Sequence, residues 1–459
     1  MRNNTENING LKYLSILVLL VGLIFYASHL SAQNASAHWK ANVVKVDITP
    51  KVPMWMAGFA SRTGPSDGTI HPIWSKALVI QDKDKNTAVL ITNDLSGMPG
   101  DMSGRIKEKI KARYALPENA VLMNFSHSHS GPVLKDYLYH VYPLSEGEIE
   151  KVNTYSDWLE EQIVDLVGKA LEGLVPAKIS SENGVTRFQV NRRNNKEAEL
   201  ETTTAVNGPN DYAVPVMKVT DLEDNIMAIV FGYACHATVL SVTQWSGDYP
   251  GFAQIALEKM YPGATAMFFQ GAGANQNPLP RRTIPLAQKY GKELAAAVES
   301  VLNEDMKPLA AQLKTAYSEI ALYLNEPPST EVLEKMIKES SGHYQRWAVM
   351  MHEKVKNNTV ELSYPYPIQI WKLGDQLMVA LGGEPVVDYA VKLKTQYGND
   401  LFVLGYSNDV MAYIPSRTVL EEGGYEGATS QIAFGHPGTW KPTLETKIFK
   451  RINRMMAGF

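Results

Sequence analysis

The sequence predicts an α/β fold, in which a single large domain contains mixed β-sheets flanked by helices. Short apolar runs, typical of buried strands, alternate with longer stretches whose apolar residues recur at helical spacing. The 459 residues are 45% hydrophobic and 20% charged, an ordinary globular composition with enough length for a large core. No internal repeat, low-complexity tract or linker interrupts the chain. We therefore predict that residues 38–459 form one domain.

The first 37 residues have the pattern of a secretory signal peptide. Arg2 and Lys12 precede an apolar run over residues 14–27, and small residues follow at 31–37. The run is short for a membrane-spanning helix, which needs roughly 20 apolar residues. We expect an exported protein (periplasmic, secreted or on the outer surface), with an uncleaved N-terminal anchor as the alternative. No later segment is long enough to span a membrane, so no stable span is expected in the mature protein.

Charge and cysteine content exclude several classes of function. Lysine and arginine number 44 against 48 acidic residues, a net charge of −4, which gives no indication of a nucleic-acid partner. The single cysteine, Cys235, excludes an intramolecular disulfide framework and a cysteine-rich zinc site.

Strand and helix patterns follow one another along the whole chain. An alternating run over residues 42–48 stops at Pro50, as expected for a first strand. Apolar residues at helical spacing over 149–174 predict a long core helix. The other predicted strands are 76–81, 87–92, 120–123, 226–235, 265–270, 368–373, 376–380 and 401–406. The other predicted helices are 102–114, one that follows segment 246–252 and ends at Met260, 284–302, 331–355 and one opened by Glu384-Pro385.

Two histidines close the apolar strand pattern at residues 120–123. Because side chains alternate along a strand, His127 and His129 are predicted to share one face, with Ser128 opposite. Neutral imidazole is a good zinc ligand, so the pair is a candidate for part of a divalent-metal site. The alternative is a polar strand end whose histidines bond only to backbone.

Further candidates also follow strands. His236 ends the apolar run 226–235 and is a second candidate ligand, while Asp248 could cap the next helix or orient a ligand imidazole. The glycine-rich loop 271–273 could offer backbone amides as an oxyanion hole. Glu384 could be an oxygen ligand or a carboxylate at a helix N-terminus. Of Arg192 and Arg193, one could hold a substrate carbonyl or carboxylate, or both could be solvated.

Three other features carry weaker indications. Residues 64–68 match the Gly-x-Ser-x-Gly pattern of hydrolase nucleophiles, but the required strand before and helix after are missing, so a turn is predicted. His352-Glu353 begins a zincin-like pattern without its second histidine, and we interpret His343 and His352 as surface residues. His71 is either a site residue or a loop histidine.

Taken in order, several segments resemble the neutral (non-lysosomal) ceramidase family, specifically its N-terminal catalytic domain. Each is weak alone, but the ordered set is fairly specific for the superfamily and covers most of the mature chain. The matching segments are 45–49, 68–71, 74–77, 126–132, 190–192, His236, 246–248, 383–384, Tyr413 and 425–427.

The resemblance implies a zinc site and a set of surrounding residues. It implies that Zn²⁺ is held by two histidines, a glutamate and a tyrosine. The residues of this chain that match the family's ligands are His127, His236, Glu384 and Tyr413. It further implies that His129, Arg192 and Tyr425 line the site around the scissile amide. The separation of the two tyrosines matches the family spacing.

Two departures from the family pattern bear on function. The family's serine lies in a Gly-Asp-x-Ser-Pro-Asn segment, whereas residues 273–278 here read Gly-Ala-Asn-Gln-Asn-Pro. Asn275 and Gln276 could position a substrate there but cannot replace serine as a nucleophile. The chain also ends near the end of the catalytic domain, so the family's C-terminal β-sandwich is expected to be lacking.

The residue patterns and the family resemblance together predict an exported zinc-dependent amidohydrolase that acts on a small-molecule or lipid N-acyl substrate. It would cleave the N-acyl bond with metal-activated water, and ceramide or another sphingolipid is a possible substrate. His129, Arg192 and Tyr425 would stabilise the oxyanion or protonate the leaving amine, with Gln276 positioning the substrate. The alternatives are a hydrolase of another soluble amide or ester, and an inactive homologue that only binds a metal or ligand.

Overall fold

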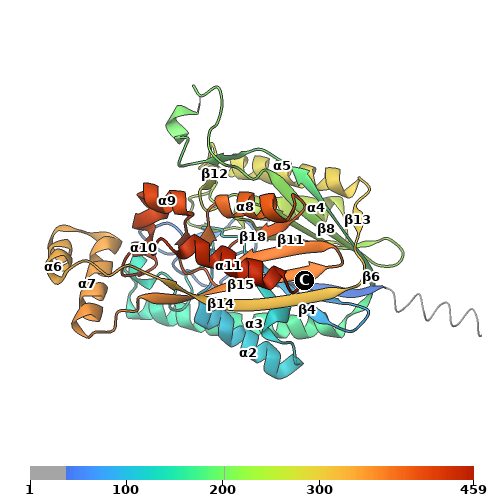
Figure 1. Ribbon diagram of the computed structural model, residues 1–459, viewed down its shortest axis with the longest axis horizontal. Coiled ribbons are helices and arrows are strands. Elements are labelled where there is room, and N and C mark those ends of the chain that lie inside the picture. Colours follow the sequence, from blue (N-terminus) through green and yellow to red (C-terminus); the bar gives the residue numbers. More distant parts are fainter. Residues whose placement is uncertain (1–37, 201) are drawn as a thin grey trace, which may run out of the picture.

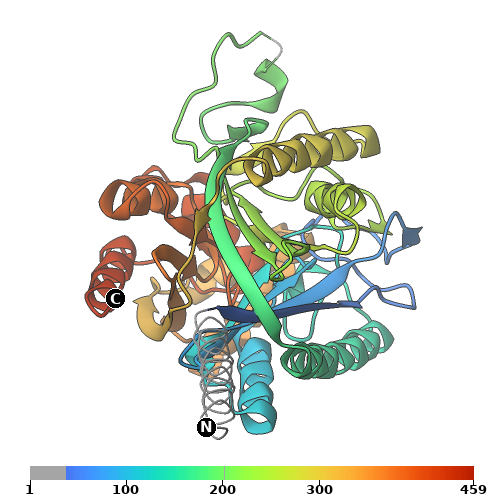
Figure 2. The same cartoon turned by 90° about the vertical axis from the view of Figure 1, so that its right-hand side faces the viewer.

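In the computed structural model, which describes residues 38–200 and 202–459, two β-sheets pack face to face and helices cover their outer surfaces (Figures 1 and 2). One core cluster fills the space between the sheets, with Leu78, Leu122, Met267 and Phe269 from the larger sheet and Trp371 from the smaller. The predicted α/β fold with mixed sheets in one large domain is therefore confirmed.

The larger sheet has nine strands in the order β11-β9-β8-β6-β1-β3-β4-β5, with β13 pairing to β6. The pairs β4–β5 and β9–β11 are parallel, whereas the other pairs are antiparallel. Its strands are β1 (Trp39–Asp47), β3 (Trp74–Gln81), β4 (Thr87–Asn93), β5 (Val121–Phe125), β6 (Val175–Val185), β8 (Ala213–Thr220), β9 (Ile226–Tyr233), β11 (Thr265–Gln270) and β13 (Lys307–Pro308).

The second sheet has four strands in the order β14-β15-β16-β18, and three two-stranded pairs lie in the connecting segments. The sheet comprises β14 (Leu313–Tyr323), β15 (Ser363–Leu373), β16 (Gln376–Leu381) and β18 (Phe402–Leu404). The small pairs are β2 (Gly68–Thr69) with β10 (Gln244–Trp245), β7 (Gln189–Asn191) with β12 (Gln276–Pro278), and β17 (Glu384–Pro385) with β19 (Tyr413–Ile414).

Helices cover both outer surfaces, because the central strands are apolar on both faces. In β3, Val79 packs towards the helices while its neighbours Leu78 and Ile80 face the second sheet. The larger sheet is covered by α2 (Gly100–Tyr114), α3 (Glu146–Glu172), α4 (Asp248–Met260) and α5 (Ile284–Leu302), and the second sheet by α8 (Asp388–Tyr397) and α11 (Leu444–Met456). The remaining helices are α6 (Thr330–Glu339), α7 (Gly342–Lys356), α9 (Arg417–Glu422) and α10 (Ser430–Ala433), with short helical turns at Glu118–Ala120, Tyr139–Val141, Glu197–Glu199 and Tyr425–Thr429.

Two helix predictions need correction. Helix α3 begins at Glu146 rather than 149, because Ser145 and Glu148 form a reciprocal capping box that satisfies amides of the first turn. The single helix predicted over 331–355 is two helices, α6 and α7. The backbone breaks at Ser340, and Gly342 begins α7 with a φ of 63°, a conformation that favours glycine.

The two edge strands of the larger sheet, β5 and β11, are joined through the chain that follows β18. The Phe125 amide donates to the Tyr406 carbonyl (3.1 Å), and the Gly405 amide donates to the Gln270 carbonyl (3.0 Å). The buried Asn124 side chain completes the junction: its Nδ2 donates to the Gly405 carbonyl (2.7 Å) and its Oδ1 accepts from the Gln270 amide (2.8 Å). One amide side chain thus ties together the ends of three strands.

None of the described helices is long and apolar enough to cross a membrane. The predicted signal peptide at residues 1–37 lies outside the described residues, so export of the protein stays a prediction.

We predict that Asn124→Ala lowers the free energy of unfolding by about 3 kcal/mol, because buried backbone groups of Gln270 and Gly405 lose their partner. Urea denaturation followed by tryptophan fluorescence measures this change. Asn357→Ala, at an exposed helix end, is the matched control and should change stability by less than about 0.5 kcal/mol. A similar small effect at Asn124 would contradict its role in the junction.

Candidate active site

The His127 and His129 pair lies just beyond β5, which ends at Phe125. His127 adopts a left-handed backbone conformation with a φ of 57°, so the two residues are not positioned by the strand alternation that the sequence suggested. The turn nevertheless brings the rings together: their Nε2 atoms are 3.0 Å apart and both side chains are buried. The two histidines are therefore close together, as predicted, but the predicted cause, alternation along a strand, is wrong.

Backbone carbonyls fix the orientation of two imidazoles. Nδ1 of His127 lies 2.6 Å from the Ser96 carbonyl, and Nδ1 of His236 lies 2.9 Å from the Gly273 carbonyl. A carbonyl only accepts, so each Nδ1 carries the proton and donates, which leaves the lone pair on Nε2. Outer partners of this kind set the tautomer of metal-binding histidines. Both Nε2 lone pairs therefore face the same buried space.

Glu384 and Tyr413 reach this space from a two-residue parallel pairing. Strands β17 and β19 place Glu384 directly opposite Tyr413. Oε2 of Glu384 is 3.3 Å from Nε2 of both His127 and His236, and the Tyr413 hydroxyl is 3.1 Å from His236 Nε2. Helix α8 begins only at Asp388, so the alternative of a helix-terminal carboxylate at Glu384 is wrong.

Burial keeps His129 and His236 neutral. Burial, followed by the nearby Arg192 charge, lowers the pKa of His236 to about 4. Burial and the neighbouring His127 lower the pKa of His129 well below its ordinary value. Ligand atoms of His127, His129 and His236 all lie within 4.8 Å of one another, so this buried cluster can hold a metal ion.

Arg192 connects the histidine cluster to a buried carboxylate. Its Nη2 donates to the Tyr413 hydroxyl (3.2 Å), its Nε donates to Glu426 (2.6 Å), and its Nη1 donates to Asn277 (3.3 Å). Arg193 instead bonds Glu422 and the other oxygen of Glu426. Of the two adjacent arginines, Arg192 is therefore the one that faces the site.

Glu426 was the main residue for which the sequence indicated no role. Its carboxylate is buried and pairs with both arginines, at 2.6 Å from Arg192 and 2.8 Å from Arg193. Burial favours a raised pKa, but the two guanidiniums outweigh it and hold the pKa of Glu426 below its usual range. The only signal was its place beside Tyr425 in segment 425–427.

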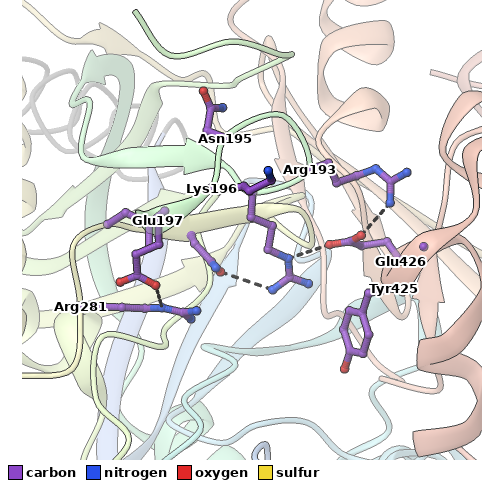
Figure 3. Close-up of a pocket in the computed structure, with 11 residues that line it drawn as sticks. Arg193, Asn195, Lys196, Glu197, Arg281, Tyr425 and Glu426 are labelled. Atoms are coloured by element: carbon purple, nitrogen blue, oxygen red, sulfur yellow. Dashed lines mark hydrogen bonds and ion pairs between the residues drawn. The ribbon is translucent and has the colours of Figure 1, made fainter. Parts of the chain in front are cut away.

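A cavity of about 600 Å³ opens beside Arg192, and we call it the entrance cavity (Figure 3). Tyr425 lies at its edge with 49% of its surface exposed, and its ring centroid is 5.2 Å from that of Tyr413. The cavity is lined by Arg192, Arg193, Lys196, Arg281, Tyr425 and Glu426, with further contributions from Asn195, Glu197, Asn277, Leu279 and Gly424.

Several other candidates have structural partners instead of facing the cluster. The Gln276 side chain donates to the Pro209 carbonyl, while its backbone carbonyl accepts from the His236 amide, so its contact with the cluster is through backbone. The predicted use of its side chain in positioning substrate stays a prediction. The Asp248 carboxylate accepts from the amides of Val239, Leu240 and Tyr249, and orients no imidazole.

The other loop features are also accounted for. The Gly271 amide bonds the Tyr233 carbonyl, and the contact that loop 271–273 makes with the cluster is the Gly273 carbonyl on His236, which is an acceptor and not an oxyanion donor. His71 bonds the Ser246 hydroxyl, away from the three clustered histidines. The serine of segment 64–68, Ser66, precedes the two-residue strand β2 and follows no strand, so it forms no nucleophile elbow.

Comparison with known proteins gives the family. The family description "Neutral/alkaline non-lysosomal ceramidase, N-terminal" matches residues 39–308, which is more than half of the chain. The chain belongs to this family. The predicted resemblance is therefore confirmed, including the part of the family to which it was assigned.

Ceramidase relatives match over part of their length. The neutral ceramidase of Drosophila pseudoobscura pseudoobscura is 26% identical over 243 residues, which are 50% of this chain and 33% of that protein. That of Drosophila melanogaster is 26% identical over 255 residues, 52% of this chain and 35% of the relative. The match thus spans about a third of the curated relatives.

Solved ceramidase structures share the fold. The neutral ceramidase of Pseudomonas aeruginosa superposes with a TM-score of 0.70 at 17% identity, covering 90% of this chain and 72% of that one. A ceramidase complexed with C2 gives a TM-score of 0.69, also at 17% identity, with coverage of 90% and 73%. At this identity the likeness establishes the common fold.

We predict that Glu426→Gln lowers the free energy of unfolding at pH 7 by about 3 kcal/mol, because two largely buried guanidiniums lose their counter-charge. Glu422→Gln is the matched control: it removes an exposed partner of Arg193 and should cost less than about 1 kcal/mol. Equal effects of the two substitutions in chemical denaturation would contradict the role given to Glu426.

The same carboxylate should make stability depend on pH. Its folded pKa is depressed, so its stabilising contribution is fully present above the unfolded value of about 4.3 and is lost as the pH falls through the folded value. The stability difference between the protein and Glu426→Gln should therefore be constant from about pH 8 to 6 and shrink below about pH 4. A difference that grows on acidification would refute the ion-pair assignment.

Proposed function

We propose that this ceramidase-family chain is an exported, zinc-dependent amidohydrolase that cleaves an N-acyl bond with activated water. The observation that carries the proposal is the convergence of His127, His129, His236, Glu384 and Tyr413 on one buried space beside Arg192. Such a set of nitrogen and oxygen donors is typical of catalytic zinc sites.

The donor set fits a divalent cation. The Nε2 atoms of His127 and His236 direct lone pairs towards a Glu384 oxygen only 3.3 Å away, an arrangement that is repulsive unless a positive charge lies among them. Nδ1 of His129 is buried without a partner among the described residues, so its ring is not held by hydrogen bonds to the scaffold. Nitrogen and carboxylate ligands without cysteine suit zinc. When bound there, Zn²⁺ supplies a Lewis acid that polarises the substrate carbonyl and acidifies water.

The surrounding residues have separate tasks. Arg192 is a fixed cation whose Nη2 already reaches the Tyr413 hydroxyl, so it can stabilise negative charge that develops on the carbonyl oxygen. The His129 ring is buried with its Nε2 3.0 Å from Nε2 of His127, so Nε2 is the atom that can exchange a proton with water in the cluster and pass it to the leaving amine. Tyr425, at the edge of the cavity, can contact the substrate as it enters.

The route through water agrees with the loop after β11. Residues 273–278 carry no serine, so this loop offers no hydroxyl nucleophile for an acyl-enzyme. The oxygens of Asn275 are already used: its carbonyl accepts from the Arg192 amide and its side chain accepts from the Val387 amide. The loop therefore acts as a support for Arg192 and His236.

The substrate class follows from the family. The matching relatives are named neutral ceramidases, so ceramide and related N-acyl compounds are the first candidates. Other soluble amides or esters are the alternatives within hydrolases. A protein that binds metal without turnover is the alternative from another class.

We expect about one equivalent of zinc in the purified protein and hydrolysis of at least one member of a fluorogenic N-acyl panel that includes short- and long-chain ceramide. His236→Ala should abolish both zinc retention and turnover, with losses of about 100-fold or more. His343→Ala, on α7, is the matched control and should leave both unchanged. Metal content by mass spectrometry and steady-state kinetics measure the two effects.

The outcomes separate the candidate functions. Zinc retention that depends on His236, with no turnover of any amide or ester, would favour the binding protein. Absence of zinc together with no effect of His236→Ala would refute the metal centre itself. The chain-length preference of an active enzyme would identify the acyl group.

A further inference from the structure

The entrance cavity is lined mainly by charged side chains. Four cations and two carboxylates line it, and Glu199 and Glu422, which are not among the lining residues, pair with Lys196 and Arg193. Leu279 is the aliphatic side chain among the lining residues, and Tyr425 is the aromatic one. A wall of this kind places several cationic groups where a charged or polar group of a ligand can reach them.

Two of the cations are already neutralised within the protein. Every guanidinium nitrogen of Arg192 has a partner, in Glu426, Asn277 and Tyr413. Arg193 is held by Glu422 and Glu426. These two arginines therefore form the wall beside the histidine cluster. Hydrogen-bond donors for a further anionic group must come from Lys196 and Arg281, which we call the outer side of the cavity.

On the outer side, the Arg281 guanidinium has hydrogen-bond donors that no described residue accepts from. Its Nε bonds Glu197 at 3.1 Å, as Figure 3 shows, and its two terminal nitrogens have no hydrogen-bond partner among the described residues. Its side chain is only 17% exposed, so these donors lie in a partly desolvated place where a charge-assisted hydrogen bond is strong. Lys196, the other outer cation, pairs only with the exposed Glu199, a weak interaction.

A second guanidinium, that of Arg282, adds positive charge beside Arg281. Arg282 stacks over Phe59 at 5.6 Å and forms no ion pair among the described residues. Burial and then the adjacent Arg281 charge lower the pKa of Arg282, because like charges beside each other disfavour the protonated form. Phe59 in turn packs edge-on against His129, with 4.7 Å between ring centroids. Arg282 is thus connected to the candidate active site through Phe59.

We propose that the substrate carries an anionic group, such as a carboxylate, on the part that extends outwards from the scissile amide, and that Arg281 binds it with support from Lys196 and Arg282. This inference rests on the proposed hydrolase function and narrows its substrate class from N-acyl compounds in general to anionic ones, so that neutral ceramide is no longer the first candidate. An anion between neighbouring cations also relieves their mutual repulsion.

The test compares matched substrates that differ in one charge. Octanoylglycine and octanoylglycinamide place the difference on the amine side, and glutaryl and pentanoyl amides of aminocoumarin place it on the acyl side. We expect kcat/KM to favour the anionic member of at least one pair by about tenfold, the value of one charge-assisted hydrogen bond. The preference should fall when the salt concentration is raised to about 1 M.

Two substitutions of opposite sign test the residue assignment. Arg281→Gln should remove most of the tenfold preference, whereas Glu197→Gln removes the negative charge beside Arg281 and should increase the preference about two- to fivefold. Lys292→Gln, an exposed charge on α5, is the control that matches the loss of one cation. If Arg281 had only a structural role, substituting Arg281 and substituting its ion-pair partner Glu197 would not change the preference for the anionic substrate in opposite directions.

Binding without turnover keeps this inference separate from the hydrolase proposal. Octylsulfonylglycine and octylsulfonylglycinamide lack a cleavable amide, and calorimetry on the metal-loaded protein gives the ratio of their dissociation constants. Equal binding and equal kcat/KM within every pair, with turnover intact, would overturn the anion site and leave the hydrolase. No turnover, but tighter binding of the anionic sulfonamide that depends on Arg281, would overturn the hydrolase and leave the anion site.

Discussion

The structure depends on the buried Asn124 amide, which joins the ends of three strands that are far apart in the sequence. Its Nδ2 and Oδ1 bond backbone groups of Gly405 and Gln270, so β5, β11 and the chain after β18 meet at one point. The residues of the candidate site follow closely: His127 and His129 leave β5, and the Gly273 carbonyl that orients His236 follows β11. A buried amide left without partners is costly, and this cost fixes the relative positions of the segments that form the site.

Around this junction the site is held in two layers. The inner layer is the set of donor atoms, and backbone carbonyls of Ser96 and Gly273 set the direction of two of them. The outer layer is electrostatic: Glu426 pairs with two arginines, and one of these, Arg192, presents its remaining donors to Tyr413 and Asn277. Because both layers are made by rigid strand ends and buried pairs, the site needs little rearrangement before a substrate binds.

Patterns of apolar residues predicted many elements of the main layers, but they missed strands β6, β8 and β14 and helix α11. The strand Thr265–Gln270 has the predicted bounds, and the predicted helix at 284–302 is α5. Periodicity could not predict the position of Glu384 beside Tyr413, because a two-residue parallel pairing between distant segments has no local signal. It also failed at His127, where a left-handed residue replaces strand alternation, and at Glu426, whose partners lie more than 200 residues away. The resemblance indicated Glu384 and Tyr413 as ligands, but the contacts of Glu426 became visible only in three dimensions.

The joining of β5 and β11 also bears on self-association. A long unpaired strand edge is a template for adding a strand from another molecule, which is how many β-rich proteins aggregate. In the larger sheet, both terminal strands in the pairing order bond the chain after β18 instead of facing solvent along their whole length. The long edge that remains in the second sheet is β14, and it carries the charged residues Lys314 and Glu319. The interaction that assembles the site thus also protects the fold against edge-to-edge pairing at high protein concentration.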